Sequence, residues 1–265
     1  MKIGIVGCAG RMGRMLIQEI LFTPAAKLSG GTERAGTAAV GQDLGTLVGA
    51  RPAGVVATTD APGLFAASDV IIDFTTPAIT LVNAELAAAT GKALVIGTTG
   101  LSDQDKTAIA AAAKKTVIVQ SPNMSVGVNA LMALTERLAG TLSDDYDIEI
   151  VEMHHSAKVD SPSGTALGLG EAAAKGRRKK LADLARRTRD GNVGPRPKGE
   201  IGFATLRGGD VVGDHTVIFA TQGERVELTH KASSREIFAK GAVRAALWCK
   251  GRPPGLYSMR DVLGL

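Results

Sequence analysis

The 265 residues of the chain allow one large domain or two modest ones, each able to bury a core without disulfides or metals. Hydrophobic residues make up 45% and charged residues 22%, which excludes a disordered or collagen-like chain. No apolar run approaches the roughly 18 to 20 residues that a membrane span needs, and glycine interrupts the first apolar run too early for a signal peptide. We therefore expect a folded cytoplasmic protein with two domains and no membrane partner.

Cysteine content and charge narrow the range of partners. Cys8 and Cys249 stand at opposite ends of the chain without Cys-x-x-Cys spacing, so we expect both to be reduced. The net charge of +5 suits nucleic acid, but equally a site for phosphates and carboxylates. Eight basic residues lie between Lys175 and Arg189, yet no aromatic residue separates them, as base stacking would require. We interpret this segment as a solvated helix and loop and expect no nucleic-acid partner.

Apolar runs of strand length alternate with alanine- and leucine-rich stretches of helix length in the first half of the chain. The runs cover residues 3–6, 70–74, 93–96 and 117–119. They are continuously apolar, which indicates burial on both faces, as in a parallel sheet covered by crossover helices. Ser102, three residues before Asp105, marks the N-cap of one such helix. This rhythm predicts the α/β class, with an N-terminal Rossmann-type dinucleotide-binding domain.

After about residue 126 the pattern changes to one more long helix and then to strands with alternating polarity, such as 147–153, 217–220 and 225–229. Turn sequences at 207–210 and 221–224 predict hairpins. A last helix, 235–247, is expected to return to the first domain. We predict a dinucleotide-binding domain of residues 1–125 and 235–265, and a second, α+β domain with a mixed sheet over 126–234. We hypothesise hinges near 123–127 and 233–235, where the chain would cross.

A strand, a glycine-rich turn and a helix start follow one another at the N-terminus. The strand of residues 2–6 runs into Gly7-Cys8-Ala9-Gly10-Arg11-Met12-Gly13, and the helix ends near Thr23. Glycines let the backbone approach a pyrophosphate, and the helix N-terminus attracts the anion. Because the first two glycines are three residues apart instead of two, a tight turn without a ligand remains an alternative for this motif alone.

Later residues strengthen the dinucleotide hypothesis. Glu33 lies twenty residues after Gly13, where a ribose-binding carboxylate is expected, and Arg34 beside it offers a guanidinium to a 2′-phosphate. We therefore predict the use of both NADH and NADPH, although an ordinary charged loop pair is the alternative. Small polar residues also follow two buried strands, at 73–77 and 97–100, where ligands of open α/β sheets bind.

The run 152–165 carries the strongest catalytic signal, with two of the four histidines. His154 and His155 are neighbours, so they share a pocket only if their strand ends or bends there. Lys158 adds a cation, and Ser163-Gly164-Thr165 opens a helical stretch whose N-terminus suits an anion. These groups fit a small carboxylate substrate and a histidine that handles a proton near neutral pH. The remaining histidines lack ligand spacing, so no metal is expected.

These motifs resemble those of the dihydrodipicolinate reductase family over nearly the whole chain. The resemblance rests on residues 7–13, 73–75, 95–100, 123–129, 152–165, 201–204 and 230–235. Its most specific part is His154-His155-x-x-Lys158-x-Asp160-x-Pro162-Ser163-Gly164-Thr165. It implies an enzyme of lysine and diaminopimelate biosynthesis that reduces an α,β-unsaturated cyclic imine dicarboxylate at ring C4, with hydride from NADH or NADPH.

The resemblance also implies residue roles and assembly. His154 supplies the proton and Lys158 assists as a cation, while His155, Gly164 and Thr165 bind substrate carboxylate. The implied cofactor contacts are Gly7, Cys8, Ala9, Gly10, Arg11, Met12, Glu33, Arg34, Gly97, Thr98, Thr99, Ser121, Pro122, Asn123 and Met124. A homotetramer assembled through the sheet of the second domain is expected. The chain departs from the family at Cys8 and at Pro122, which lacks a backbone donor, and the basic stretch 176–198 stays outside the resemblance.

Two other classes of function remain open from the sequence. A Rossmann-type dehydrogenase acting on an amino acid, such as aspartate or homoserine dehydrogenase, would share the nucleotide half, and only residues 152–165 argue against it. A nicotinamide-sensing or nucleic-acid-binding protein would keep the fold and lose catalysis. Intact His154 and Lys158 argue against that alternative, whereas salt-dependent DNA binding would favour it.

Overall fold

The computed structural model describes residues 1–265, which divide into two compact units. The first unit comprises residues 1–126 with 236–264, and the second comprises residues 127–235. The boundaries expected from the sequence lie one residue before these at each crossing. No helix has the length and apolar character needed to cross a membrane.

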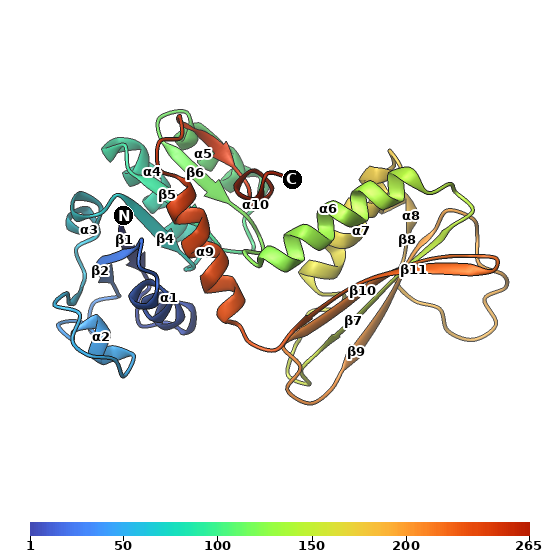
Figure 1. Cartoon of the computed structure of the whole chain (residues 1–265), viewed down its shortest axis with the longest axis horizontal. Helices are drawn as coiled ribbons and strands as arrows, with labels where there is room; N and C mark the ends of the chain where they lie inside the picture. Colours follow the sequence, from blue (N-terminus) through green and yellow to red (C-terminus); the bar gives the residue numbers. More distant parts are fainter. The chain divides into compact units, whose positions relative to one another are not determined.

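A seven-stranded parallel sheet forms the centre of the first unit, in the order β12-β6-β5-β4-β1-β2-β3 (Figure 1). Its strands are β1 (Lys2–Val6), β2 (Lys27–Thr32), β3 (Ala57–Thr58), β4 (Val70–Asp73), β5 (Ala93–Ile96), β6 (Val117–Gln120) and β12 (Gly255–Tyr257). The strand order reverses between β1 and β4, which is the topological switch point of a doubly wound sheet. The predicted Rossmann-type fold class is confirmed.

Helices cover both faces of this sheet, which explains why its strands are continuously apolar. Helices α1 (Arg11–Phe22) and α9 (Glu236–Trp248) pack on one face, and α3 (Ala61–Ala67), α4 (Pro77–Thr90) and α5 (Asp103–Ala113) on the other. The short helices are α2 (Leu44–Leu47) and α10 (Met259–Leu263). Ile3 and Ile5 belong to the core between the sheet and helices α1 and α9, whereas Ile71 and Leu94 belong to the core on the opposite face, under α3, α4 and α5. The predicted N-cap is confirmed, because Ser102 forms a capping box at the start of α5.

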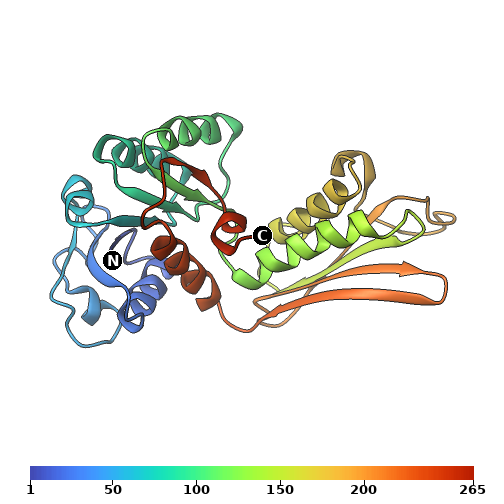
Figure 2. The ribbon, with the colours of Figure 1, turned by 45° about the horizontal axis from the view of Figure 1, so that its top comes forward.

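The second unit is a mixed five-stranded sheet in the order β11-β10-β7-β9-β8. Its strands are β7 (Asp147–His154), β8 (Ala185–Arg186), β9 (Ile201–Arg207), β10 (Gly213–Thr221) and β11 (Glu224–Ala232). Helices α6 (Val126–Thr141) and α7 (Gly164–Gly176) lie against one face (Figure 2), and α8 (Leu181–Leu184) follows them. Ile148, Ile150, Val217 and Phe219 alternate with half-exposed residues and point into the core under the helices.

The two hairpins predicted from turn sequences have different outcomes. The turn at 221–224 joins β10 to β11 in a true hairpin, but the hairpin predicted at 207–210 is wrong, since β7 lies between β9 and β10. The connection instead crosses the carboxyl end of β7, where Gly208 N donates to His154 O at 2.9 Å and His155 N donates to Val211 O at 2.7 Å. A turn sequence specifies a local reversal, whereas strand neighbours depend on non-local packing.

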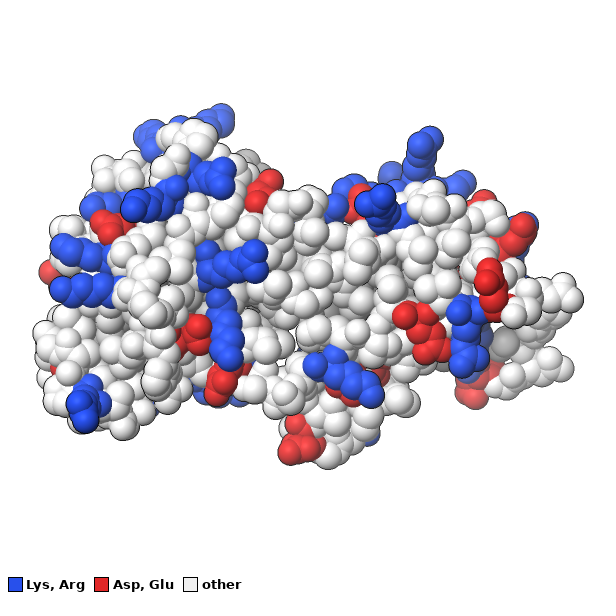
Figure 3. All heavy atoms as spheres, in the orientation of Figure 1, with Lys and Arg blue, Asp and Glu red and all other residues white.

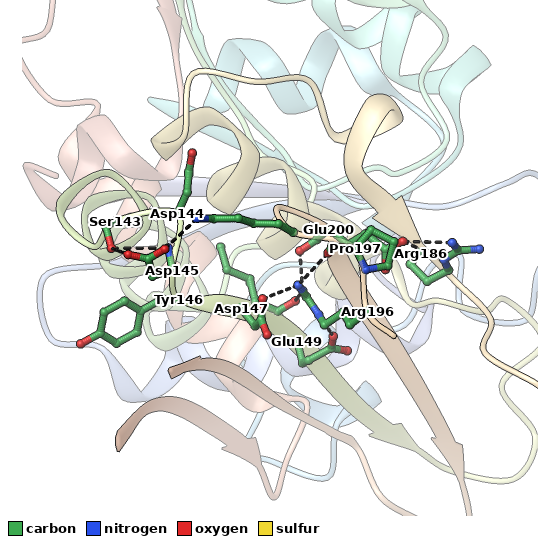
Figure 4. A network of polar contacts seen from close by, with 12 residues as sticks. Ser143, Asp144, Asp145, Tyr146, Asp147, Glu149, Arg186, Arg196, Pro197 and Glu200 are labelled. Carbon is green, nitrogen blue, oxygen red and sulfur yellow. Dashed lines mark hydrogen bonds and ion pairs between the residues drawn. The ribbon is translucent and has the colours of Figure 1, made fainter. Parts of the chain in front are cut away.

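Arginines of the basic stretch 176–198 form ion pairs with acidic residues on or next to the sheet of the second unit (Figure 4). Arg196 Nε lies 2.9 Å from Glu149 Oε1, Arg196 Nη1 lies 2.5 Å from Asp147 Oδ1, and Arg196 Nη2 donates to Ile148 O. Arg186 and Arg189 both pair with Glu200. Acidic and basic side chains therefore lie side by side over this unit (Figure 3). Arg186 and Arg189 are exposed to solvent, as expected, and they also pair with acidic residues that were not visible as their neighbours in the sequence.

Arg196→Ala should loosen the loop of residues 190–200. The substitution removes the charged donor of two backbone carbonyl groups, Ile148 O and Glu200 O, and one of the two arginines that bind Glu149. Hydrogen bonds to charged groups contribute roughly 1.5–3 kcal/mol each. We expect a fall in the free energy of unfolding of about 2 kcal/mol in a urea titration, with earlier trypsin cleavage in the loop. The control is Lys198→Ala, whose partner Asp145 is exposed and whose loss should leave the urea midpoint nearly unchanged. Equal midpoints for both variants would contradict the prediction.

Candidate functional site

The glycine-rich turn lies between the carboxyl end of β1 and the start of α1. Gly7 has φ +69°, a left-handed conformation that glycine adopts without strain. A Cβ on Gly13 would overlap the carbonyl oxygen of Gly7, so only glycine lets α1 approach the turn this closely. The N-cap Gly10 offers no side-chain cap, which leaves the first N–H groups of α1 facing outward. The turn therefore has the geometry of an anion site at a helix N-terminus.

The two charged residues after β2 differ sharply in exposure. The Glu33 side chain is 11% exposed; its carboxylate accepts from Ala9 N at 3.1 Å and from Arg34 N at 3.0 Å. The Arg34 side chain is 91% exposed. Cys8 is fully buried, and burial raises the pKa of its thiol to about 11. Cys8 can thus contribute only its backbone, whereas Glu33 is bound to the turn and Arg34 projects into solvent.

A cavity of about 300 Å³ opens at the carboxyl ends of β4, β5 and β6. Seven of the expected cofactor residues line it, namely Met12, Gly97, Thr98, Thr99, Pro122, Asn123 and Met124, together with Phe74, Thr75 and Phe238. Ser121 lies underneath, where its hydroxyl donates to Asn123 O at 2.9 Å. Apolar side chains beside loop hydroxyl and amide groups suit a flat ring that carries a carboxamide. The residues present therefore fit a nicotinamide dinucleotide.

Asp73 ties together the loops that line this cavity. It is fully buried, and its carboxylate accepts from Thr75 N at 2.8 Å, Thr75 Oγ1 at 2.6 Å and Asn83 Nδ2 at 2.9 Å. Thr98 from the next loop lies 3.5 Å away and accepts from Thr80. The sequence marked this loop only as small and polar, and the structure shows that it is built around a carboxylate.

In the second unit, β7 ends at His154, so His155 leaves the strand. His154 is 8% exposed, and its Nδ1 lies 2.6 Å from Glu152 Oε2. An ionised carboxylate only accepts, so Nδ1 carries a hydrogen and Nε2 is the nitrogen that gains or loses a proton. Burial lowers the pKa of His154, and Glu152 opposes that shift. His154 is therefore a buried imidazole with a fixed tautomer.

Cationic and helix-end groups accompany His154. Lys158 donates its backbone N–H to His155 O at 3.1 Å, and its Nζ lies 2.7 Å from Asp160 Oδ1. Gly164 and Thr165 form the first turn of α7, which Ser163 caps by accepting from Ala166 N. The N-terminal end of a helix dipole favours anions. These elements supply an ammonium group and a helix end suited to a carboxylate ligand.

Some residues of this cluster carried no role in the sequence analysis. Arg207 binds both oxygens of Glu152 from the neighbouring strand β9, at 2.8 and 3.0 Å. His215 on β10 lies edge-on to His154, with 5.1 Å between ring centroids. Arg235 Nη2 is 3.4 Å from His155 Nε2. No local motif marks Arg207 or His215, whereas Arg235 ends the run 230–235 that contributed to the resemblance.

Comparisons with known proteins agree over the whole chain. Residues 1–124 match the model "Dihydrodipicolinate reductase, N-terminus" and residues 127–263 match "Dihydrodipicolinate reductase, C-terminus". A 4-hydroxy-tetrahydrodipicolinate reductase from Methylocella silvestris is 57% identical, covering 100% of this chain and 97% of the relative. One from Anaeromyxobacter dehalogenans is 52% identical, covering 100% of this chain and 98% of the relative.

Solved structures share the fold at lower identity. A dipicolinate-bound dihydrodipicolinate reductase from Paenisporosarcina superposes with a TM-score of 0.79 at 21% identity, covering 98% of both chains. An amine dehydrogenase from Mycobacterium smegmatis gives a TM-score of 0.63 at 14% identity, covering 97% of this chain and 94% of the neighbour. The fold alone is thus compatible with several reductive chemistries. The family models and the relatives above 50% identity identify the family. The chain belongs to the dihydrodipicolinate reductase family.

Proposed function

We propose that the chain catalyses the NAD(P)H-dependent reduction of 4-hydroxy-tetrahydrodipicolinate, through dihydrodipicolinate, to tetrahydrodipicolinate in lysine and diaminopimelate biosynthesis. The observation that carries the proposal is the buried His154, whose Nδ1 is fixed by Glu152 beside Lys158 and the first turn of α7. This cluster combines a proton donor with groups that attract carboxylates. The reduction of an imine dicarboxylate needs both a proton donor and groups that bind its carboxylates.

The residues of the second unit supply the proton and hold the substrate. When bound, the nicotinamide provides the hydride that adds to ring C4 of the conjugated imine. The electron pair displaced by that addition must be protonated, and protonated His154 donates this proton from Nε2. Lys158 stabilises the negative charge beside the ring, while His155, Gly164 and Thr165 bind a carboxylate of the substrate. We add Arg235 to this group because its guanidinium lies next to the His155 ring.

Substituting either proposed catalytic residue should abolish turnover and spare cofactor binding. We expect His154→Gln and Lys158→Ala each to lower kcat by roughly 10²- to 10⁴-fold, the range for a lost acid or positioned charge. The assay follows the loss of reduced-nicotinamide absorbance with freshly generated 4-hydroxy-tetrahydrodipicolinate. Affinity for NADH, measured by calorimetry, should stay within about twofold, since the residues proposed to bind it lie in the other unit. A wild-type protein that binds NADH without oxidising it would contradict the proposed function.

The charged pair after β2 supports use of both cofactors. The partly buried carboxylate of Glu33 is placed to accept from a ribose hydroxyl, and the exposed Arg34 side chain is available to a 2′-phosphate. A hydrogen bond to a charged group contributes roughly 1.5–3 kcal/mol, or about 10- to 100-fold in affinity.

Exchanging one charge of this pair should therefore select one cofactor. Arg34→Ala is expected to weaken NADPH binding at least about tenfold and to leave NADH nearly unchanged. Glu33→Gln should weaken NADH and favour NADPH, because it removes an anion near the 2′ position. Dissociation constants for both cofactors measure the change, with Arg51→Ala, an exposed residue of the same unit, as the control. Parallel losses for both cofactors in Arg34→Ala would contradict this role.

A homotetramer is proposed through the sheet face that α6 and α7 leave uncovered. Val151, Met153, Leu206 and Ile218 lie on that face, and Leu206 is 49% exposed. Exposed apolar side chains in the middle of a sheet are typical of a subunit interface.

Leu206→Asp should shift the mass measured by light scattering from tetramer to smaller species. The matched control is Leu256→Asp, an exposed leucine of the first unit, which should leave the mass unchanged.

A further inference from the structure

We propose that Glu152 and Arg207 form a positioning pair, which holds the proton-donating histidine, the first turn of α7 and the lysine-bearing turn in one arrangement. The inference rests on the proposed function, because it takes His154 as the proton donor. Neither residue needs to touch the substrate, so each acts through its neighbours.

The Glu152 carboxylate is the shared acceptor of three segments. Its side chain is fully buried, and Oε2 lies 2.6 Å from His154 Nδ1. Oε1 accepts from Ser163 N at 3.0 Å, the N-cap residue of α7. Both oxygens also accept from Arg207 on β9. A carboxylate held by four donors cannot rotate, so the imidazole and the helix start keep a fixed separation.

Arg207 extends this arrangement to the turn that carries Lys158. Its Nη2, besides binding Glu152, donates to Asp160 O at 2.7 Å. The Asp160 side chain in turn pairs with Lys158 Nζ at 2.7 Å. One guanidinium thus connects the buried carboxylate to the backbone of the catalytic turn, with a planar fork that lysine lacks.

The pair also sets which nitrogen of His154 releases a proton. Because Glu152 holds Nδ1–H, the transferable proton is on Nε2, which faces Gly213; a Cβ there would lie 3.0 Å from Nε2. The neighbouring His215 on β10 stays neutral, since burial lowers its pKa to about 4. Glycine at position 213 leaves space beside Nε2, and a neutral His215 adds no competing charge there.

The charges that face His154 act in opposite directions. They are Glu152 on its own strand, Arg207 on β9 and Lys158 on the turn. Burial lowers the pKa of His154, Glu152 raises it, and Lys158 and Arg207 lower it. Removing the anion should therefore lower this pKa, and removing the cation of the pair should raise it. A purely structural role predicts no such opposition, because loss of either partner would disturb His154 alike.

The experiment compares Glu152→Gln and Arg207→Met. Histidine ring signals are titrated by NMR, and the four histidines are assigned by single substitutions. The same proteins give kcat and KM as functions of pH. For Glu152→Gln we expect the His154 pKa, and the pH above which kcat falls, to move down by roughly half a unit or more; for Arg207→Met both should move up. In Glu152→Gln, kcat near neutral pH should fall by about tenfold or more, with KM for NADH unchanged.

The matched control is Glu149→Gln. Glu149 lies on the same strand, points to the opposite face, and is likewise bound by arginine, here by Arg189 and Arg196 where Glu152 has Arg207 alone. The identical chemical change there should lower the urea midpoint and leave the His154 pKa and the pH profile of kcat in place. Arg207→Lys separates charge from geometry, because it keeps the cation and loses the fork. We expect its kcat to fall while the His154 pKa holds.

The outcomes separate this inference from the proposed function. Unchanged titration of His154, or shifts in the same direction in Glu152→Gln and Arg207→Met, overturns the positioning pair even if the wild type is an active reductase. Opposite shifts in a protein that reduces no substrate leave the pair standing and remove the function. If one variant does not fold, the direction of the other decides. If neither folds, a loss of kcat in Arg207→Lys supports the pair, and wild-type kcat in that variant overturns it.

Discussion

A carboxylate with no exposed surface must be matched by donors, and the second unit is arranged to meet that requirement at Glu152. Parallel pairing of β7 with β9 sets His154 opposite Arg207, so the guanidinium arrives by strand register. The N-cap of α7 supplies a backbone N–H from a third segment. An unpaired buried charge would be strongly destabilising. The hydrogen bonds that stabilise this end of the sheet are therefore the same ones that fix the positions of its reactive groups.

The first unit meets a similar constraint with neutral donors. Asp73 is also fully buried at the end of a strand, but hydroxyl, amide and backbone groups bind it, and no arginine or lysine hydrogen-bonds to its carboxylate. These donors come from the loop after β4 and from α4, with Thr98 of the next loop close by. The carboxyl ends of parallel strands lie at one edge, so one acceptor there can fix several loops. Each unit thus uses a buried carboxylate to hold otherwise irregular backbone in place.

Most of the first unit could be predicted from the sequence because its signals are local. A strand, glycine turn and helix within 22 residues specify a Rossmann start, and continuous apolar runs specify strands buried on both faces. The role of Arg207 could not be predicted, since it lies 53 residues from His154 and meets it only through non-local pairing. The turn sequence at 207–210, which begins with Arg207, instead favoured a hairpin between β9 and β10. The different exposure of Glu33 and Arg34 likewise depends on tertiary packing, which adjacency in sequence does not reveal.

The pairing of an acid with an arginine follows from what a proton donor must do. A buried glutamate alone beside His154 would stabilise the imidazolium and make its proton hard to release. Burial without any acid would leave the imidazole neutral, with no proton to give. The Arg207 guanidinium balances the carboxylate, so the geometry of a strong hydrogen bond is kept while part of its electrostatic bias is cancelled. A donor that must lose and regain a proton in each cycle is best served by such a balance, because catalysis is most efficient when the donor pKa lies near the working pH.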